Sequence, residues 1–174
     1  MRTTWAIDAG HSSLLFTIRH LVIAKVRGRF SRFGGALELD DADLARSSAR
    51  IEVDVASIDT ALEPRDAHLR SPDFFDVARF PTATLISRSI AKRGDDYVML
   101  GELSLHGIAQ EIELQVAFGG KARDPRGRER VAFSASATID REAFGLRWNQ
   151  LLEAGGVAVG RTAELAIELQ ALAA

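Results

Sequence analysis

The sequence predicts an all-β protein whose antiparallel strands close into an eight-stranded barrel. Apolar and polar residues alternate along several segments, and in a strand such alternation gives one apolar face and one wet face. Clusters of glycine, aspartate and proline separate these segments, which is typical of hairpin turns. The chain of 174 residues has the length of one domain, and we expect a single barrel domain over residues 1–174.

Three segments show the alternation most clearly. Ile51, Val53 and Val55 are separated by acidic residues, and the same period runs over 112–118 and 163–169. A helix would place residues i and i+2 on different faces and would bury the intervening carboxylates. We therefore expect strands in all three segments.

Weaker alternation predicts the remaining strands and brings their number to about eight. They are expected at 14–20, 26–40, 83–90, 97–105, 131–140 and 157–170. Glycine inside a strand usually marks a bulge or a bend, so we expect irregularities at Gly34-Gly35 and at Gly160. The two edges of such a sheet must be covered, either by pairing them in a barrel or by packing two sheets together.

Three connections carry turn residues. Arg93–Asp96 and His106-Gly107 predict tight hairpin turns. Gly119–Gly127 begins and ends with turn formers, and we expect a longer loop there. Its basic residues, with those that follow as far as Arg130, raise the hypothesis of an anion-binding patch, whereas a charged hairpin tip ordinarily stays solvated.

The widest gap between predicted strands runs from Ser57 to Phe80. Pro64–Arg70 combines a proline suited to a first helical turn with residues of good helical propensity. Ser71–Asp73 should then begin a second short turn that carries Phe74 and Phe75. Two neighbouring aromatic side chains beside a barrel predict either a lid over its mouth or ordinary core that closes it.

Composition excludes several functions. The chain has no cysteine, which rules out disulfides, iron–sulfur clusters, thiolate zinc sites and thiol catalysis. Its 22 basic and 24 acidic residues give a net charge of −2, so we expect no nucleic-acid partner and no bulk attraction to anionic membranes. No apolar run reaches the roughly 18 residues of a membrane-spanning helix. The N-terminus lacks the apolar core of a signal peptide, and we expect a cytoplasmic protein, or a periplasmic one if a leader has been removed.

Catalytic motifs are scarce. The four histidines, His11, His20, His68 and His106, are scattered, and none has a partner in a familiar metal-binding pattern. The chain contains no HExxH, no GxSxG, no phosphate-binding GxxxxGK[ST] and no GxGxxG motif. We therefore expect no catalytic residues, no metal and no cofactor.

His20 is the histidine with the clearest link to the barrel interior. It shares strand parity with Phe16 and Ile18 and so points to the apolar face. A partly buried imidazole needs a hydrogen-bond partner. That partner is either a structural neighbour or the headgroup of a ligand held in a cavity.

Alternation alone leaves open whether the barrel is hollow. Ala135 and Ala137 lie beside Phe133 and Ile139 on a predicted inner face. Small inward side chains leave space for a ligand, or they merely relieve crowding where a barrel tapers.

Nine short blocks with characteristic residues follow one another along essentially the whole chain. They are Ile7–Ser12, Phe16–Leu21, Val26–Phe30, Ser57–Thr60, Arg65–Leu69, Ser71–Asp76, Phe80–Thr84, Gly101–Gly107 and Asp140–Leu146. In this order they resemble the YceI-like domain family. The resemblance implies a lipocalin-like, eight-stranded antiparallel barrel that holds a long apolar chain, in characterised relatives a polyisoprenoid or a fatty amide. It also implies a binding or transport role without catalysis, and a homodimer. Many members are periplasmic with a cleaved leader, and this sequence begins without one.

Position and strand parity, carried over from the resemblance, give the candidate ligand-binding residues. They are Phe16, Ile18, His20, Phe30, Ile51, Val53, Leu103, Leu105 and Phe133, with Phe74 and Phe75 near the mouth. Each buried CH₂-sized group of a ligand contributes roughly 0.8 kcal/mol, so a long chain is held without an ion pair. Such a site selects by length and girth more than by polar chemistry.

Two alternative functions remain on sequence grounds. One is an enzyme that acts on an apolar substrate with His20 or His68 as the acid–base group. The other is a structural or interaction domain whose barrel is filled by its own side chains. Such a domain would contact a partner through the Lys121–Arg130 loop or an edge strand.

Overall fold

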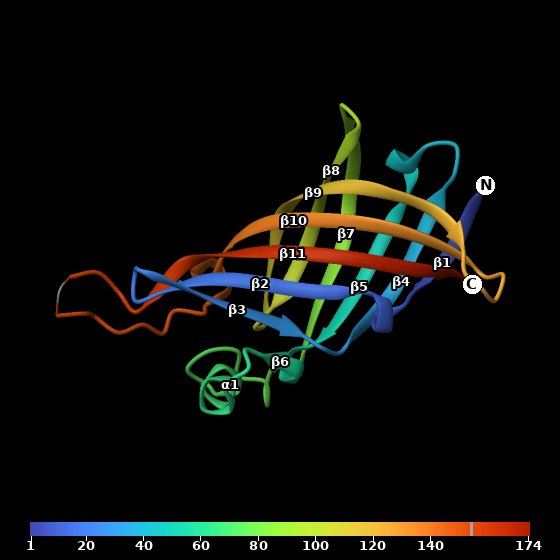
Figure 1. The fold of residues 1–174 in the computed structure, drawn as a ribbon. Coiled ribbons are helices and arrows are strands. Elements are labelled where there is room, and N and C mark those ends of the chain that lie inside the picture. The colour runs from blue at the N-terminus through green and yellow to red at the C-terminus, as the bar shows by residue number, and fades with distance from the viewer. Residues whose placement is uncertain (154) are drawn as a thin grey trace.

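The computed structural model describes residues 1–153 and 155–174 as one strongly curved antiparallel sheet (Figure 1). Its strands are β1 (Arg2–Ile7), β2 (Ser13–His20), β3 (Ala24–Phe30), β4 (Phe33–Asp40), β5 (Ser48–Asp54), β6 (Ile58–Asp59), β7 (Thr82–Arg93), β8 (Asp96–Leu105), β9 (Ile108–Arg123), β10 (Glu129–Asp140) and β11 (Val159–Ala173). Helix α1 (Glu63–Arg70) and short 3-10 turns at Ala9–His11, Leu44–Arg46, Val55–Ser57 and Arg141–Phe144 connect them. No helix in the described residues is long and apolar enough to cross a membrane.

The sheet closes because one edge of β11 pairs with two strands in succession. The end of β11 pairs with β1, from Trp5↔Ala173 to Ile7↔Ala171, and the rest pairs with β2. The 3-10 turn at Ala9–His11 separates β1 from β2, so these two strands behave as one long bent strand. β4 pairs with β1 and β3 pairs with β2, which makes β3 and β4 a second bent strand.

Counted in this way, the described chain forms an eight-membered antiparallel ring in which each strand pairs with its neighbours in sequence. Its members are β1/β2, β3/β4, β5/β6, β7, β8, β9, β10 and β11, with β11 next to β1/β2. The sequence-based prediction of an all-β, eight-stranded antiparallel barrel is therefore confirmed. The predicted helix at Pro64–Arg70 is confirmed too, as are the tight turns after β7 and β8.

Several element boundaries differ from the prediction. Residues 26–40 form two strands, because the backbone bends at Ser31-Arg32 and bonds there to Ser57. Strand β1 was not predicted, since its alternation is weak and Trp5 is its one fully buried side chain. The predicted loop at 119–127 is mostly strand, because a register shift between β9 and β10 accommodates its glycines and leaves a turn at 124–128.

The predicted bulges have different outcomes. The register of β11 against β2 shifts between Val159 and Ala163, which confirms the irregularity at Gly160. The register of Gly34-Gly35 against β5 is regular, so of the bulge or bend expected there no bulge forms, and the bend in this stretch lies at Ser31-Arg32. Gly35 is instead required by a close approach, because its φ is +142° and a Cβ atom would lie 2.0 Å from the carbonyl oxygen of Arg50.

Carboxylates neutralise the basic residues near the β9–β10 turn. Lys121 pairs with Asp41, Arg123 with Glu129, and Arg128 with Asp124. Little unpaired positive charge is left for an anion, which argues against the anion-binding patch considered from the sequence.

Arg130 links the same turn to the closure of the barrel. Its Nη1 donates to Asp8 at 2.7 Å and to Gln170 at 3.4 Å, and its Nε donates to Asp124 at 3.3 Å. Burial alone would raise the pKa of Asp124, but hydrogen bonds from Arg128 and from the N–H of Arg126 lower that pKa to about 2. Asp124 is therefore ionised at neutral pH.

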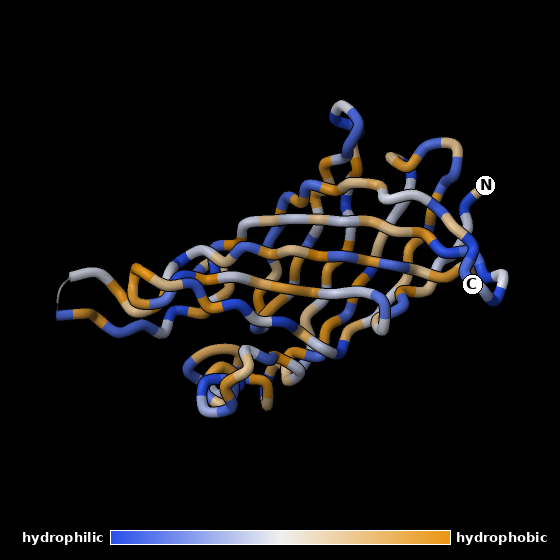
Figure 2. Tube along the Cα trace, viewed as in Figure 1, coloured by the Kyte–Doolittle hydropathy of each residue, from blue (hydrophilic) through white to orange (hydrophobic). Residues whose placement is uncertain are grey.

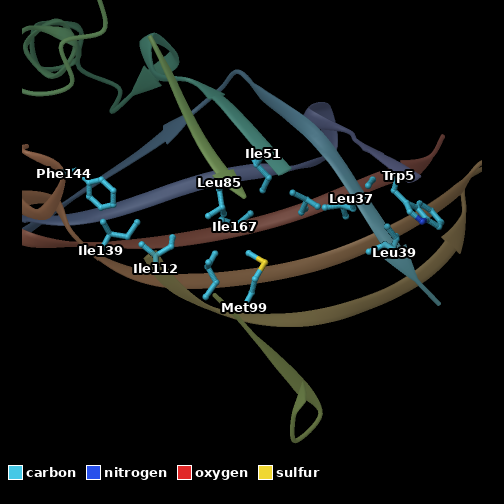
Figure 3. Packing of buried hydrophobic residues seen from close by; sticks show 14 of the residues in the cluster. Trp5, Leu37, Leu39, Ile51, Leu85, Met99, Ile112, Ile139, Phe144 and Ile167 are labelled. Atoms are coloured by element: carbon cyan, nitrogen blue, oxygen red, sulfur yellow. The ribbon is translucent and has the colours of Figure 1, made fainter. Parts of the chain in front are cut away.

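Apolar side chains alternate with polar ones along the strands (Figure 2), and the inward-facing ones form the core. Figure 3 shows Trp5, Leu37 and Leu39 packed together toward the end where β1 and β4 lie. Ile51, Leu85, Met99, Ile112 and Ile167 occupy the middle of the barrel. The half beyond them, toward α1, is less completely filled by side chains.

We expect Gly35→Ala to lower the free energy of unfolding by about 3 kcal/mol, since the added methyl group collides with backbone and the φ is unfavourable. Gly34→Ala is the matched control, because no atom lies within 4 Å of the added Cβ. Urea unfolding of both variants checks this, and equal stabilities would contradict the close approach.

The low pKa of Asp124 predicts a pH-dependent contribution to stability. A carboxylate whose pKa is lower in the folded state than its ordinary value of 3.8 stabilises the fold above that value, and the contribution disappears as pH falls through the folded pKa of about 2. Asp124→Asn should therefore destabilise the protein at neutral pH and progressively less below pH 4. Urea unfolding at several pH values measures this, and a pH-independent difference would refute it.

Candidate ligand-binding cavity

The barrel encloses a cavity of about 310 Å³ in the half nearest α1. Most strands of the ring contribute inward-facing aliphatic and aromatic side chains to its wall, and α1 with the turn that follows it covers one side. The apolar lining exists because each strand places alternate residues inside the barrel. The filled-barrel alternative therefore does not describe this half of the molecule.

The structure places ten of the eleven sequence-predicted site residues in the wall of this cavity. They are Phe16, Ile18, His20, Phe30, Ile51, Val53, Phe74, Phe75, Leu103 and Leu105. Eight of them lie in strands, where parity assigns a side chain to the inner or the outer face, and Phe74 and Phe75 lie in the turn after α1.

Phe133 is the exception, because it lines a second and smaller cavity of about 90 Å³ near the β1–β4 end. It points inward as predicted, but it lies too far along β10 to reach the larger cavity, opposite Leu169 and Phe118. Strand parity predicts the face of a side chain and says nothing of its height along the barrel axis.

Three aliphatic side chains separate the two cavities. Ile51, Leu85 and Ile167 line both of them, and Figure 3 shows the three close together in mid-barrel. The space available to a ligand in the larger cavity ends at these side chains.

Aromatic rings close the larger cavity beside α1. His68, Phe74 and Trp148 pack on one another, with ring centroids 4.7–5.3 Å apart. Phe75 meets Phe30 edge-on at 6.0 Å. Phe74 is buried and also lines the cavity. The sequence left two alternatives for this aromatic pair, a lid over the mouth or core that closes the barrel, and Phe74 combines the two.

Trp148 and Arg141 are wall residues that sequence reasoning missed. Both lie in the segment between β10 and β11 that has no regular strand, and there alternation carries no signal. Arg141 is 5% exposed, and a buried arginine cannot be recognised as such from its neighbours in the sequence.

Arg141 fastens this irregular segment to the barrel through backbone carbonyls. Its Nε donates to Gly160 at 2.7 Å, its Nη1 to Leu146 and Trp148, and its Nη2 to Val159 at 3.3 Å. Burial lowers the pKa of this guanidinium, and the nearby carboxylates of Glu142 and Asp140 oppose that effect. No carboxylate in the described residues forms an ion pair with Arg141, so carbonyl dipoles hold the charge.

Every titratable side chain that lines the larger cavity is basic in type. These side chains are Arg19, His20, Arg65, His68 and Arg141. Arg65 donates to the hydroxyl and the carbonyl of Thr60, both at 2.7 Å, and that hydroxyl in turn donates to the buried Asp66.

Three of the four histidines have structural partners. His11 contacts Asp8, His68 contacts Asp73 and His106 contacts the carbonyl of Phe144, each at 2.8 Å. His20 is half-buried in the cavity wall. Among the described residues no three metal-ligating side chains gather at one place.

The geometry offers the enzyme alternative little support. The lining of the larger cavity contains no carboxylate, and the chain has no cysteine. An acid–base histidine also needs a reacting partner group. The Thr60 hydroxyl, which lines the cavity, is already engaged with Asp66 and Arg65.

Comparisons with known proteins agree with this architecture. A family model of the YceI-like domain matches residues 5–171. A UPF0312 protein of Staphylococcus aureus (strain USA300) is 36% identical over 160 residues, which cover 91% of each chain.

Solved structures share the fold. BcnA of Burkholderia cenocepacia superposes with a TM-score of 0.82 at 23% identity, over 94% of this chain and 98% of BcnA. The YCEI protein of Campylobacter jejuni gives 0.74 at 27% identity, over 90% of both chains. A polyisoprenoid binding domain from Saccharophagus degradans, implicated in plant cell wall breakdown, gives 0.70 at 19% identity over 99% of both.

We expect Arg141→Lys to lower the free energy of unfolding by about 3 kcal/mol, because one ammonium group cannot reach carbonyls on both sides of the guanidinium and leaves some unpaired. Arg126→Lys serves as the control, since this exposed arginine makes no side-chain hydrogen bond among the described residues. Chemical denaturation compares the two, and an Arg141→Lys protein as stable as the control would refute the anchoring role.

Proposed function

The chain belongs to the YceI-like domain family, and we propose that its barrel binds and carries a long-chain apolar ligand, a polyisoprenoid or a lipid of similar girth. The observation that carries this proposal is the cavity of about 310 Å³ with an almost entirely hydrocarbon lining. A space of this kind in a closed barrel is a ready site for an apolar molecule.

The energetics of such a complex are favourable without any ion pair. About ten buried methylene-sized groups contribute about 8 kcal/mol of transfer free energy, from which the cost of immobilising the ligand is subtracted. An empty apolar cavity also lacks dispersion contacts that a ligand would restore. Length and girth of the chain, rather than polar groups, then decide which ligand binds.

The proposed contacts follow the walls of the cavity. Phe16, Phe30 and Phe75 form a continuous set of aromatic contacts, with successive ring centroids 5.6 and 6.0 Å apart, along which an unsaturated chain would pack. Leu103 and Leu105 would contact the chain from β8. His20 would face the polar end of the ligand, because its imidazole has no hydrogen-bond partner among the described residues.

The name of one structural neighbour supports the ligand class. The Saccharophagus degradans protein is described as a polyisoprenoid binding domain. That likeness is one of fold, and the apolar lining of this chain's own cavity is what extends the ligand class to it.

We expect Ala163→Trp to weaken ligand binding at least tenfold, because Ala163 lies in the cavity wall opposite Ile18 and an indole there occupies the space of the ligand. Ala166→Trp is the matched control on the same strand, with an exposed side chain outside the cavity. Titration with dansyl-labelled undecanoic acid, whose emission rises in an apolar site, compares the variants after thermal unfolding has shown both to be folded. Equal affinities for the two folded variants would count against a ligand in this cavity.

A further inference from the structure

Two neighbouring turns carry an exposed apolar surface at one end of the molecule. It consists of Leu21, Val22 and Ile23 between β2 and β3, with Leu151 and Val157 from the segment before β11, and we call it the apolar tip. The exposed fractions of Ile23 and Leu151 are 88% and 84%. Half of the exposed large apolar side chains in the described residues belong to this tip.

The two turns lie side by side. The N–H of Leu21 donates to the carbonyl of Ala158 at 2.8 Å, and a Cβ atom on Gly156 would lie 3.1 Å from the side chain of Val22. Figure 1 shows both turns extending beyond the body of the barrel at the same end, and Figure 2 shows apolar residues at the β2–β3 turn. The tip is therefore a convex projection rather than a groove.

The turn between β2 and β3 has unusual residues for its backbone. Leu21 and Val22 have φ angles of +54° and +65°, a conformation that glycine and asparagine adopt far more readily than leucine or a β-branched residue. Folding alone does not favour apolar side chains at these positions. Their presence points to a use for the exposed surface that they form.

Unpaired positive charge lies directly behind the tip. Arg19 and Lys25 are cross-strand partners and Arg27 follows on the same face of the hairpin, while Arg19 also borders the larger cavity. Arg147 is exposed on the segment that leads to the second turn. None of the four has an ion-pair partner in the described part of the chain, and Glu164 lies on the neighbouring strand, opposite Thr17.

The tip also stands next to the larger cavity. His20, Val26, Trp148 and Val159 line that cavity, and each lies within a few residues of the apolar tip along the chain or across a strand pair. A surface that held the tip would therefore lie close to the larger cavity.

We propose that the apolar tip inserts into an anionic lipid surface, with Arg19, Lys25, Arg27 and Arg147 contacting the headgroups. Apolar side chains that project beyond basic residues suit the boundary between headgroups and acyl chains. A second copy of the chain fits less well, because a two-fold contact between tips would bring the same cations of both copies together. Entry of an apolar ligand from that surface into the larger cavity would rest on the proposed function, whereas the docking of the tip does not.

Flotation with vesicles tests the docking. We expect the protein to float with vesicles of phosphatidylcholine and phosphatidylglycerol, and much less with phosphatidylcholine alone or in high salt. Leu21→Asn/Val22→Gly/Ile23→Ser should reduce the bound fraction about tenfold. Because Asn-Gly suits a turn with positive φ, this variant should unfold at the same or a higher temperature. Lys25→Gln/Arg27→Gln should weaken the preference for anionic vesicles, because two of the four cations are lost. Ile108→Ser, which changes an exposed apolar side chain outside the tip, should change nothing.

Three results would overturn the proposal. The first is wild-type protein that stays unbound on the anionic vesicles, and the second is a folded tip variant that floats as well as the wild type. The third is a dimer, seen by size-exclusion chromatography, that the tip variant abolishes, since the tip would then be a contact between copies.

Titration with dansyl-labelled undecanoic acid separates the two proposals. A tip variant that binds the probe normally shows a defect of docking alone, and wild-type protein that floats without binding the probe refutes the cavity function alone.

Discussion

The double pairing of β11 is the interaction on which the rest of the structure depends. One edge of this strand bonds to β1 at one end and to β2 along the remainder, so the sheet has no long open edge and its backbone groups are satisfied around the ring. A closed ladder of hydrogen bonds holds the walls apart, and this allows half of the interior to remain unfilled. Arg130 reinforces the same closure, since it joins Asp8 beside β1, Gln170 on β11 and Asp124 in the β9–β10 turn.

One half of the barrel interior is packed and stabilises the fold, and the other half is hollow and available to a ligand. Toward β1 and β4, Trp5, Leu37 and Leu39 pack into a dense core that leaves only a small cavity. Toward α1 the walls are apolar but stand apart, and this half lacks the dispersion contacts that the dense half has. Ile51, Leu85 and Ile167 stand at the boundary. The dense end can stabilise the fold while the hollow end keeps a surface that a hydrocarbon chain would complete.

Alternation in the sequence predicts the strands and their inner faces well, because the pleat of a strand gives each side chain one of two directions. Together with the family resemblance, it identifies eight strand residues of the larger cavity wall before any coordinates are known, whereas Phe74 and Phe75 lie in the turn after α1, where alternation carries no signal. It does not predict height along the barrel axis, which is why Phe133 lies in the other cavity. Arg141 and Trp148 escape prediction because they belong to a segment without a repeating backbone. The burial of Arg141 depends on carbonyls that only the folded chain brings together, and Trp148 is placed by its packing on His68 and Phe74. The sequence also does not show why position 35 requires glycine, because the requirement comes from the carbonyl oxygen of Arg50 on the neighbouring strand.

The central claim is that the unfilled half of the barrel is a site for a long apolar chain. Native mass spectrometry of the purified protein, before and after extraction with organic solvent, tests it most directly. The account predicts a complex of one lipid molecule per chain that extraction removes and that reappears when the protein is exposed to a total lipid extract. A spectrum that shows only the bare polypeptide, both as purified and after that exposure, would contradict the claim.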